Sequence, residues 1–418
     1  MEKGERATGR IKVVDANRVP GARTKWVEID LDTIGHNVRE IRRFLRPEVK
    51  MAAIVKADAY GHGAVPAVKT VLANGADVLG VTSVSEAQEL RRAGIVVPIL
   101  VLGSLLPDEA PAVVKYDLTP ALFSLPVARR LDNLAGSAGK IVAVHLNVDT
   151  GMGRYGLSPE QMLEFARTVR EMSNLSIEGI FTHFAAAFTM DKQFTHGQFE
   201  CFRQVCEALA DDGLHIPCRH AASSAAVLRY PETHLDMVRV GALLYGQGPV
   251  PEINTVVNLR PAWQLKTRLV HVREMPAGAN IGYGQDFRLP KATTAAVIPV
   301  GYADGFAVQP VNRPVHLKDV VRQIVKDIAR FLNLRRVRET VAIKGRPAPL
   351  IGRVGMQHCV LDVGRIEDVA AGEEIVLDGK RSIVSPRIPR YYRRDGNLCR
   401  YRAGIPDGRG NITLVRRK

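Results

Sequence analysis

Short apolar runs rich in β-branched residues alternate with amphipathic segments between about residues 30 and 244. Eight runs predict strands, at 51–55, 78–82, 98–102, 118–122, 141–148, 177–183, 216–221 and 237–244. Seven segments predict helices, at 33–45, 64–73, 85–93, 125–134, 159–172, 197–210 and 223–229. This alternation indicates a parallel sheet with crossover helices, and eight strands predict an α/β TIM barrel, (β/α)8. An open doubly wound sheet is the alternative, although it normally carries a glycine-rich dinucleotide turn.

The pattern changes after about residue 258. Alternating strand patterns cover 263–274, 293–300, 341–344, 352–363 and 374–377. We therefore expect a polar N-terminal extension (1–25), a barrel domain (26–258) and a mostly β C-terminal domain (259–418). Residues 317–334 are the exception, because their apolar side chains share one helical face. They predict a helical insertion near 315–335 that packs locally or at a subunit contact.

The net charge of +15 is concentrated in a basic tail, because residues 380–418 hold twelve Lys and Arg against two Asp. Such a tail can contact nucleic acid or an anionic surface. It can equally be a solvated extension, or one that packs on a neighbouring subunit. Few aromatic residues are interspersed in the tail. We therefore favour a solvated or subunit-packed extension and expect no nucleic-acid partner.

The apolar segments and the cysteines indicate the compartment in which the protein works. The first 25 residues lack the apolar stretch of a secretion signal, and no run approaches the roughly 20 apolar residues of a membrane helix. The five cysteines are scattered, without the paired spacing of a metal site. We expect reduced thiols, no metal, no membrane contact and a cytoplasmic location.

Reactive residues follow the predicted strands, where the active site of a TIM barrel is built. Lys56 ends the first strand. Burying an ammonium there is costly, so a lysine at this position is seldom structural and indicates a function. Burial would make its amine nucleophilic, as Schiff-base chemistry requires. The others, in chain order, are Tyr60, Asn147, Asp149, Arg154, His183, Ser223, Ser224, Arg239 and Gly241.

Several of these residues have a structural explanation as well. His183 fits a hydrogen-bonded core histidine as well as a functional one. Ser223 and Ser224 fit a plain helix cap, or a phosphate site at a helix N-terminus. Gly241 would allow a ligand to approach the backbone closely.

The segment Lys56-Ala57-Asp58-Ala59-Tyr60-Gly61-His62-Gly63 resembles the cofactor-lysine signature of the alanine racemase family, which are fold-type III pyridoxal-phosphate enzymes. Further motifs follow in the family's order, so the resemblance extends over about residues 26–390. They are Asp149-Thr150-Gly151-Met152-Gly153-Arg154, Thr182-His183-Phe184-Ala185, Val238-Arg239-Val240-Gly241, Gly282-Tyr283-Gly284, Gly301-Tyr302-Ala303-Asp304-Gly305 and Gly352-Arg353-Val354-Gly355-Met356.

The resemblance implies racemisation of alanine by two bases, Lys56 and a Tyr283 contributed by the partner subunit of a homodimer. It implies that pyridoxal 5'-phosphate is held by Lys56, Tyr60, Arg154, His183, Ser224, Arg239, Gly241 and Ala242. A small amino-acid substrate would contact Arg154, Tyr302 and Met356. The resemblance also implies synthesis of D-alanine, a peptidoglycan precursor.

Departures from the family pattern cluster around the substrate and the cofactor phosphate, where Pro386 replaces a phosphate-binding tyrosine. Asn147 stands where many members have a carbamylated lysine that orients the arginine, so a bound anion such as chloride is expected beside Arg154. Gly355, Gln357 and Pro386 also replace usual residues. Two alternatives therefore stay open: a broad-spectrum or other amino-acid racemase (serine, lysine, arginine or ornithine), and a non-catalytic pyridoxal-phosphate-binding protein.

Overall fold

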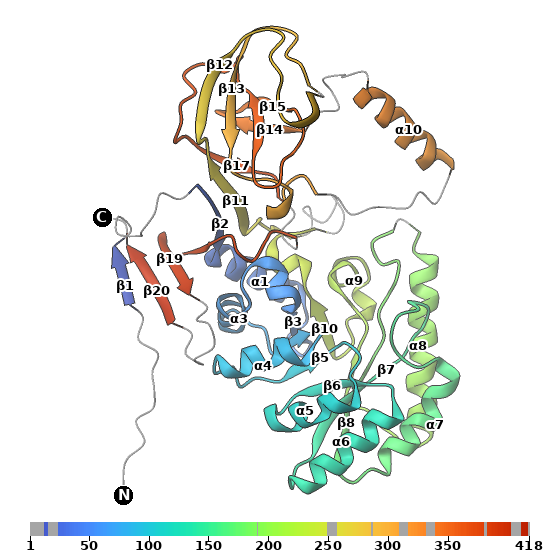
Figure 1. The fold of residues 1–418 in the computed structure, drawn as a ribbon. Helices are drawn as coiled ribbons and strands as arrows, with labels where there is room; N and C mark the ends of the chain where they lie inside the picture. Colours follow the sequence, from blue (N-terminus) through green and yellow to red (C-terminus); the bar gives the residue numbers. More distant parts are fainter. Residues whose placement is uncertain are drawn as a thin grey trace, which may run out of the picture.

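The computed structural model describes residues 12–15, 24–189, 191–248, 257–285, 287–308, 317–331, 339–379, 383–402 and 411–416. An α/β barrel forms the lower part of the molecule in Figure 1, and sheets of the C-terminal segment lie above and beside it. Most of the extension expected over 1–25 lies outside the described residues, as do residues 332–334 of the predicted helix.

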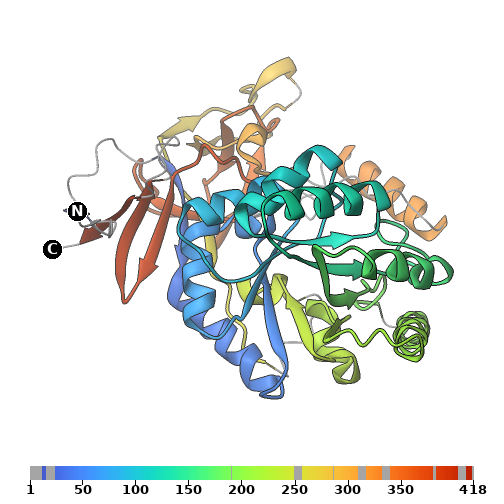
Figure 2. The same cartoon turned by 90° about the horizontal axis from the view of Figure 1, so that it is seen from below.

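Eight parallel strands form the barrel (Figure 2), and from β3 to β9 each pairs with the next strand in the chain. The last strand, β10, also pairs with the first, β3. On the other side of β10, the Arg239 amide donates to the Ala222 carbonyl at 2.9 Å, so the barrel is nearly closed. The TIM barrel is confirmed, and the open doubly wound sheet is wrong. The strands are β3 (Lys50–Ile54), β4 (Val78–Val81), β5 (Ile99–Val101), β6 (Thr119–Leu122), β7 (Val142–Asn147), β8 (Leu175–Phe181), β9 (Cys218–His220) and β10 (Met237–Val240).

Amphipathic helices cover the outside of the barrel. α1 begins where the Asp30 carboxylate accepts the Thr33 amide, and it buries Ile34, Val38 and Ile41. The helix predicted at 197–210 begins earlier, at Gln193, and α5 was not predicted. The helices are α1 (Leu31–Phe44), α3 (Ala64–Ala73), α4 (Val84–Arg92), α5 (Ala110–Tyr116), α6 (Leu125–Ser137), α7 (Pro159–Arg170), α8 (Gln193–Asp211) and α9 (Ser224–Arg229).

The C-terminal segment contributes to two sheets. The five-stranded sheet has the order β12-β13-β16-β15-β14, and the seven-stranded sheet has the order β1-β20-β19-β18-β2-β11-β17. Their bounds are β12 (His271–Met275), β13 (Thr293–Ile298), β16 (Cys359–Asp362), β15 (Arg346–Ile351), β14 (Thr340–Ile343), β1 (Lys12–Asp15), β20 (Asn411–Arg416), β19 (Asn397–Arg402), β18 (Arg390–Arg394), β2 (Lys25–Asp30), β11 (Trp263–Arg268) and β17 (Glu374–Leu377).

Several predicted strands need correction. The strand predicted at 263–274 is two strands, because Leu269 and Val270 carry the chain from one sheet to the other. The strand predicted at 352–363 begins only at Cys359, since Gly352 has a positive φ and turns the chain. The basic tail forms the strands β18, β19 and β20, which were not predicted.

Strand β2 ties the beginning of the chain to its end. It lies between β11, to which it is antiparallel, and β18, to which it is parallel. Its Val27 and Ile29 side chains are fully buried. The strand that leads into the barrel therefore also completes a sheet of the C-terminal segment.

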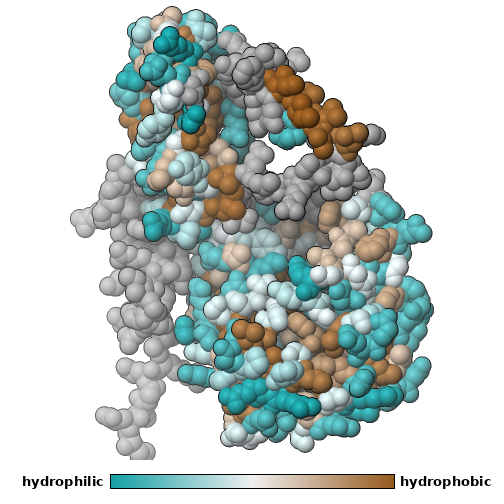
Figure 3. Space-filling view, turned by 45° about the vertical axis from the view of Figure 1, so that its right-hand side comes forward, coloured by the Kyte–Doolittle hydropathy of each residue, from teal (hydrophilic) through white to brown (hydrophobic). Residues whose placement is uncertain are grey.

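Helix α10 (Leu317–Phe331) forms in the predicted insertion. It stands apart from the sheets and the barrel, and Figure 3 shows its apolar side chains on the surface. None of the described helices combines the length and apolar character needed to cross a membrane.

Candidate active site

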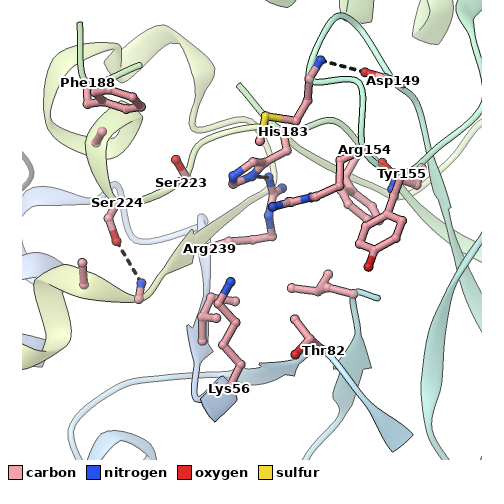
Figure 4. Close-up of a pocket in the computed structure, with 18 of the residues that line it drawn as sticks. Lys56, Thr82, Asp149, Arg154, Tyr155, His183, Phe188, Ser223, Ser224 and Arg239 are labelled. Carbon is pink, nitrogen blue, oxygen red and sulfur yellow. Dashed lines mark hydrogen bonds between the residues drawn. The ribbon is translucent and has the colours of Figure 1, made fainter. Parts of the chain in front are cut away.

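A cavity of about 540 Å³ opens at the carboxyl ends of the barrel strands. Every barrel residue for which a cofactor role is expected lines it: Lys56, Tyr60, Arg154, His183, Ser224, Arg239, Gly241 and Ala242. Figure 4 shows Lys56, Arg154, His183, Ser224 and Arg239 around this space. Asn147, Asp149 and Ser223 line it too. The structure therefore brings this group together in one space.

The backbone after Lys56 makes a left-handed turn. Lys56 begins the short helix α2 (Lys56–Gly61), in which the four residues 57–60 all have φ between 52° and 55°. Left-handed helical backbone costs L-residues roughly 1–2 kcal/mol each, so the surroundings must fix it. The Asp58 carboxylate accepts the Ala64 amide at 2.7 Å, and the Glu86 carboxylate accepts the Ala57 amide at 2.6 Å. From β18, Arg390 Nε donates to the Gly61 carbonyl at 3.1 Å.

The Lys56 amine is in an environment that favours its neutral form. Burial lowers its pKa, and the nearby Arg154 guanidinium lowers it further, against the opposing effect of Glu86. A neutral amine is a nucleophile and a base, whereas an ammonium is neither. Lys56 is therefore suited to attack a carbonyl or to accept a proton.

Arg239 is held rigidly within the barrel. Its guanidinium donates to the carbonyls of Thr182 at 2.6 Å, His220 at 2.8 Å and Ala221 at 3.1 Å. It also lies 2.8 Å from His220 Nδ1, and His220 Nε2 lies 2.8 Å from His145 Nδ1. Burial lowers the pKa of Arg239 to about 9, so it remains charged at neutral pH.

His183 lies beside this arginine, with its Nδ1 3.4 Å from Arg239 Nη2. Burial lowers the pKa of His183 to about 3, and the charges of Arg239, Arg154 and Lys56 act in the same direction. The imidazole is therefore neutral at physiological pH. It can stack on a ring or take part in hydrogen bonds without adding another cation.

Ser224, Gly241 and Tyr60 form another side of the cavity. The Gly241 amide donates to Ser224 Oγ at 2.9 Å. A Cβ atom on Gly241 would lie only 2.4 Å from the Tyr60 hydroxyl oxygen, so glycine permits this close approach. Burial raises the pKa of Tyr60, which keeps its hydroxyl protonated and able to donate to an anion.

The three remaining predicted residues do not line this cavity. Tyr283, Tyr302 and Met356 are 82%, 50% and 61% exposed. Their segments nevertheless lie together: the Tyr302 amide donates to the Gly355 carbonyl, and the Ala303 amide donates to the Met356 carbonyl. Beside them, Gly352 contacts Ile281. The structure thus contains a second group of predicted site residues, exposed on the C-terminal segment.

Sequence reasoning missed several residues of the site. Thr82, Leu102, Phe181 and Phe188 line the cavity, and Tyr155 lies there against the Arg154 guanidinium. His145 and His220 were missed as neighbours of Arg239. Imidazoles within apolar strands were the available signal, because a buried polar group needs a partner. Among the described residues, no three His, Cys, Asp or Glu side chains are grouped as metal ligands.

Comparisons with known proteins agree with this geometry. Residues 29–249 match the model of the alanine racemase N-terminal domain, and residues 262–389 match that of the C-terminal domain. An alanine racemase from Desulforamulus reducens is 40% identical over 85% of this chain and 90% of its own. One from Methanococcus maripaludis is 38% identical over 91% of this chain and 97% of its own.

Solved structures show the same likeness. Alanine racemase from Clostridium difficile superposes with a TM-score of 0.81 and 29% identity, over 91% of this chain and 98% of its own. The enzyme from Bacillus anthracis with bound L-Ala-P gives a TM-score of 0.78 and 29% identity, over 91% and 97%. The chain belongs to the alanine racemase family and is an isomerase.

Proposed function

We propose that the protein interconverts L- and D-alanine with the help of pyridoxal 5'-phosphate. The observation that carries this proposal is the cavity itself, in which a lysine of lowered pKa lies among Arg154, His183 and the buried Arg239. Such a site can bind an anionic, carbonyl-bearing group covalently through the lysine. Family membership indicates that this group is pyridoxal phosphate and that the substrate is alanine.

The residues present fit the cofactor. Ser224, Tyr60 and the backbone at Gly241 and Ala242 would hold its phosphate, since glycine leaves space there and the hydroxyls can donate. Arg239 would face its ring nitrogen and keep that nitrogen unprotonated, because two cations repel each other. Lys56 would hold it covalently, and His183 and Arg154 would contact it. When bound, the cofactor would draw electrons from the substrate Cα and make its proton more acidic.

Racemisation requires that a proton leave one face of Cα and that a proton reach the opposite face. Lys56 Nζ would serve one face, and its lowered pKa allows it to accept a proton. The tyrosine expected at the other face is Tyr283, which is exposed and does not line the cavity. We propose that Tyr283 reaches the cavity of a second subunit, together with Tyr302 and Met356, so that a homodimer forms two shared sites.

Mixing two inactive chains tests the shared site. A Lys56→Ala chain and a Tyr283→Phe chain, refolded together in equal amounts, would form heterodimers with one intact site. Because random pairing makes about half of the dimers heterodimers, D-alanine formation should recover to about a quarter of the native rate. If both residues serve their own chain, the mixture stays inactive. Sedimentation velocity of the mixture verifies that dimers have formed.

The substrate range has a second candidate, a broader amino-acid racemase. Asn147 is buried at the cavity and Gly355 adjoins the exposed Met356, so two departures from the family pattern lie in the segments that would contact substrate. Rates with alanine, serine, lysine, arginine and ornithine decide between the candidates. Activity confined to alanine would remove the broader one.

A further inference from the structure

One face of helix α10 is apolar and exposed. Six of its apolar side chains are 37–79% exposed, so no part of the described chain buries them: Leu317, Val320, Val321, Ile324, Val325 and Ile328. Their spacing places them on one side of the helix, and Figure 3 shows them as a continuous apolar surface. A stripe of this kind marks an interaction site on a folded protein.

The charge around this helix indicates what covers it. Residues 308–338 hold eight Lys and Arg against two Asp, a net charge of +6. Residues 26–258, which include the barrel, hold 21 Lys and Arg against 26 Asp and Glu, a net charge of −5. Two copies of the segment 308–338 would repel each other, whereas this segment and a barrel attract each other.

The barrel carries three exposed aromatic side chains around the cavity mouth, which we call the rim and define as Tyr155, Phe188 and Phe194. These rings are 41%, 57% and 51% exposed. Tyr155 and Phe188 line the cavity. Phe194 lies beside Gly151. In the sequence, Gly151 stands between Asp149 and Met152, which both line the cavity. Aromatic side chains exposed together around a cavity are typical of the centre of an interface.

We propose that α10 of one subunit packs across the rim of the partner's barrel. This inference rests on the proposed homodimer, in which the C-terminal segment of each chain brings Tyr283 and Tyr302 to the other chain's cavity. Helix α10 follows Tyr302 in the same segment, after residues 309–316. The apolar face would cover the three aromatic rings, and the opposite net charges of segment 308–338 and residues 26–258 would favour the contact. The helix would thereby narrow the route by which substrate reaches Lys56.

Cross-linking tests the contact directly. Val325→Cys and Phe194→Cys are introduced together into the full chain, with Cys201 and Cys206 changed to serine, and treated with a bismaleimide. We expect a covalent dimer from the double variant and from neither single variant. A covalent dimer from Val325→Cys alone would mean that two α10 helices pair, which overturns the inference. A link within one chain would mean that α10 covers its own barrel, which also overturns the inference.

A second measurement separates this inference from the proposed function. The variant Val321→Gln/Ile324→Gln/Val325→Gln removes the apolar face and keeps good helix formers. Its dimer dissociation constant should rise by roughly 100-fold, because three buried apolar side chains are lost. The control Val96→Gln/Ile141→Gln changes two exposed residues of the barrel segment and should leave that constant unchanged.

The remaining outcomes are decisive as well. An unchanged dissociation constant in the triple variant overturns the α10 contact and leaves the shared-site dimer intact. A native chain that is monomeric and active overturns both. Binding of native protein to phosphatidylglycerol vesicles that the triple variant loses, with an unchanged dimer, would assign the apolar face to an anionic lipid surface instead.

Discussion

The cavity of the barrel and the exposed face of the C-terminal segment differ in how they are held. In the barrel, Arg239 is buried and donates to three carbonyls, so its position is fixed within one subunit. On the C-terminal segment, Tyr283 is mostly exposed. One half of the proposed site therefore lies within a single chain, whereas the other half would be covered only in the proposed homodimer.

The largest effect is expected at the barrel. Lys56→Ala should lower the rate of D-alanine formation by at least about 10⁴-fold, because it removes both the covalent attachment and one base. The absorbance of bound cofactor should be lost with it. Lys69→Ala changes an exposed lysine of α3 and serves as the control. Retention of substantial activity by Lys56→Ala would exclude the proposed role.

On the other half of the site, Tyr283→Phe removes only a hydroxyl. We expect turnover to fall by about 10²–10⁴-fold, the usual contribution of an acid–base group, while cofactor absorbance is retained. Since Tyr283 is exposed in the subunit, the melting temperature of dilute protein should not change. A normal rate for Tyr283→Phe would mean that another group serves the second face of Cα.

The free energy of unfolding should respond differently to substitutions in the barrel cavity and on the exposed C-terminal segment. Arg239→Met removes the guanidinium that donates to the carbonyls of Thr182, His220 and Ala221, inside the barrel. The free energy of unfolding should decrease by about 3 kcal/mol, as measured by urea denaturation. Tyr302→Phe, on the exposed face, should change it by less than about 0.5 kcal/mol. Equal effects of the two substitutions would mean that the barrel cavity and the exposed C-terminal segment do not differ in how their residues are held.

The smallest expected effect concerns pH. Burial lowers the pKa of His145 to about 4, compared with 6.5 for an ordinary histidine. Between these values the unfolded chain binds a proton that the folded protein does not, so stability decreases as the pH falls. From pH 6.5 to 5 this histidine should account for a loss of about 1.5 kcal/mol. His145→Gln should reduce the loss of stability between these two pH values by that amount, and His196→Gln, which changes an exposed histidine of α8, serves as the control.

The order of the barrel strands followed from the sequence, because each buried strand is a short apolar run with a helix pattern after it. The strands β18 and β19 were missed, because their arginines conceal the alternation around Tyr391 and Tyr392. The turn at Ala57–Tyr60 could not be predicted either. Four residues without a glycine ordinarily favour right-handed backbone, and the contacts from Glu86 and Arg390 that fix this turn come from distant parts of the chain.

The candidate site was predictable to a similar degree. Lys56 stood out because burying an ammonium at the end of a strand is costly. His183 by itself fitted a core histidine equally well, and the family resemblance supplied the expected roles of His183 and Arg239. Their chemical state was not predictable, since the lowered pKa of His183 results first from its burial and then from the charges of Arg239, Arg154 and Lys56. The exposure of Tyr283 and of α10 also depends on packing, which a hydrophobic pattern does not specify.

Strand β2 has a consequence for how the chain is made. Ile29 pairs with Trp263 and Tyr392, which leave the ribosome long after it. At about 5–20 residues per second, translation delays these partners by tens of seconds. During that interval the barrel segment is fully synthesised while β2 lacks both of its neighbouring strands. A nascent chain of this protein therefore carries β2 with two unpaired edges throughout most of its synthesis.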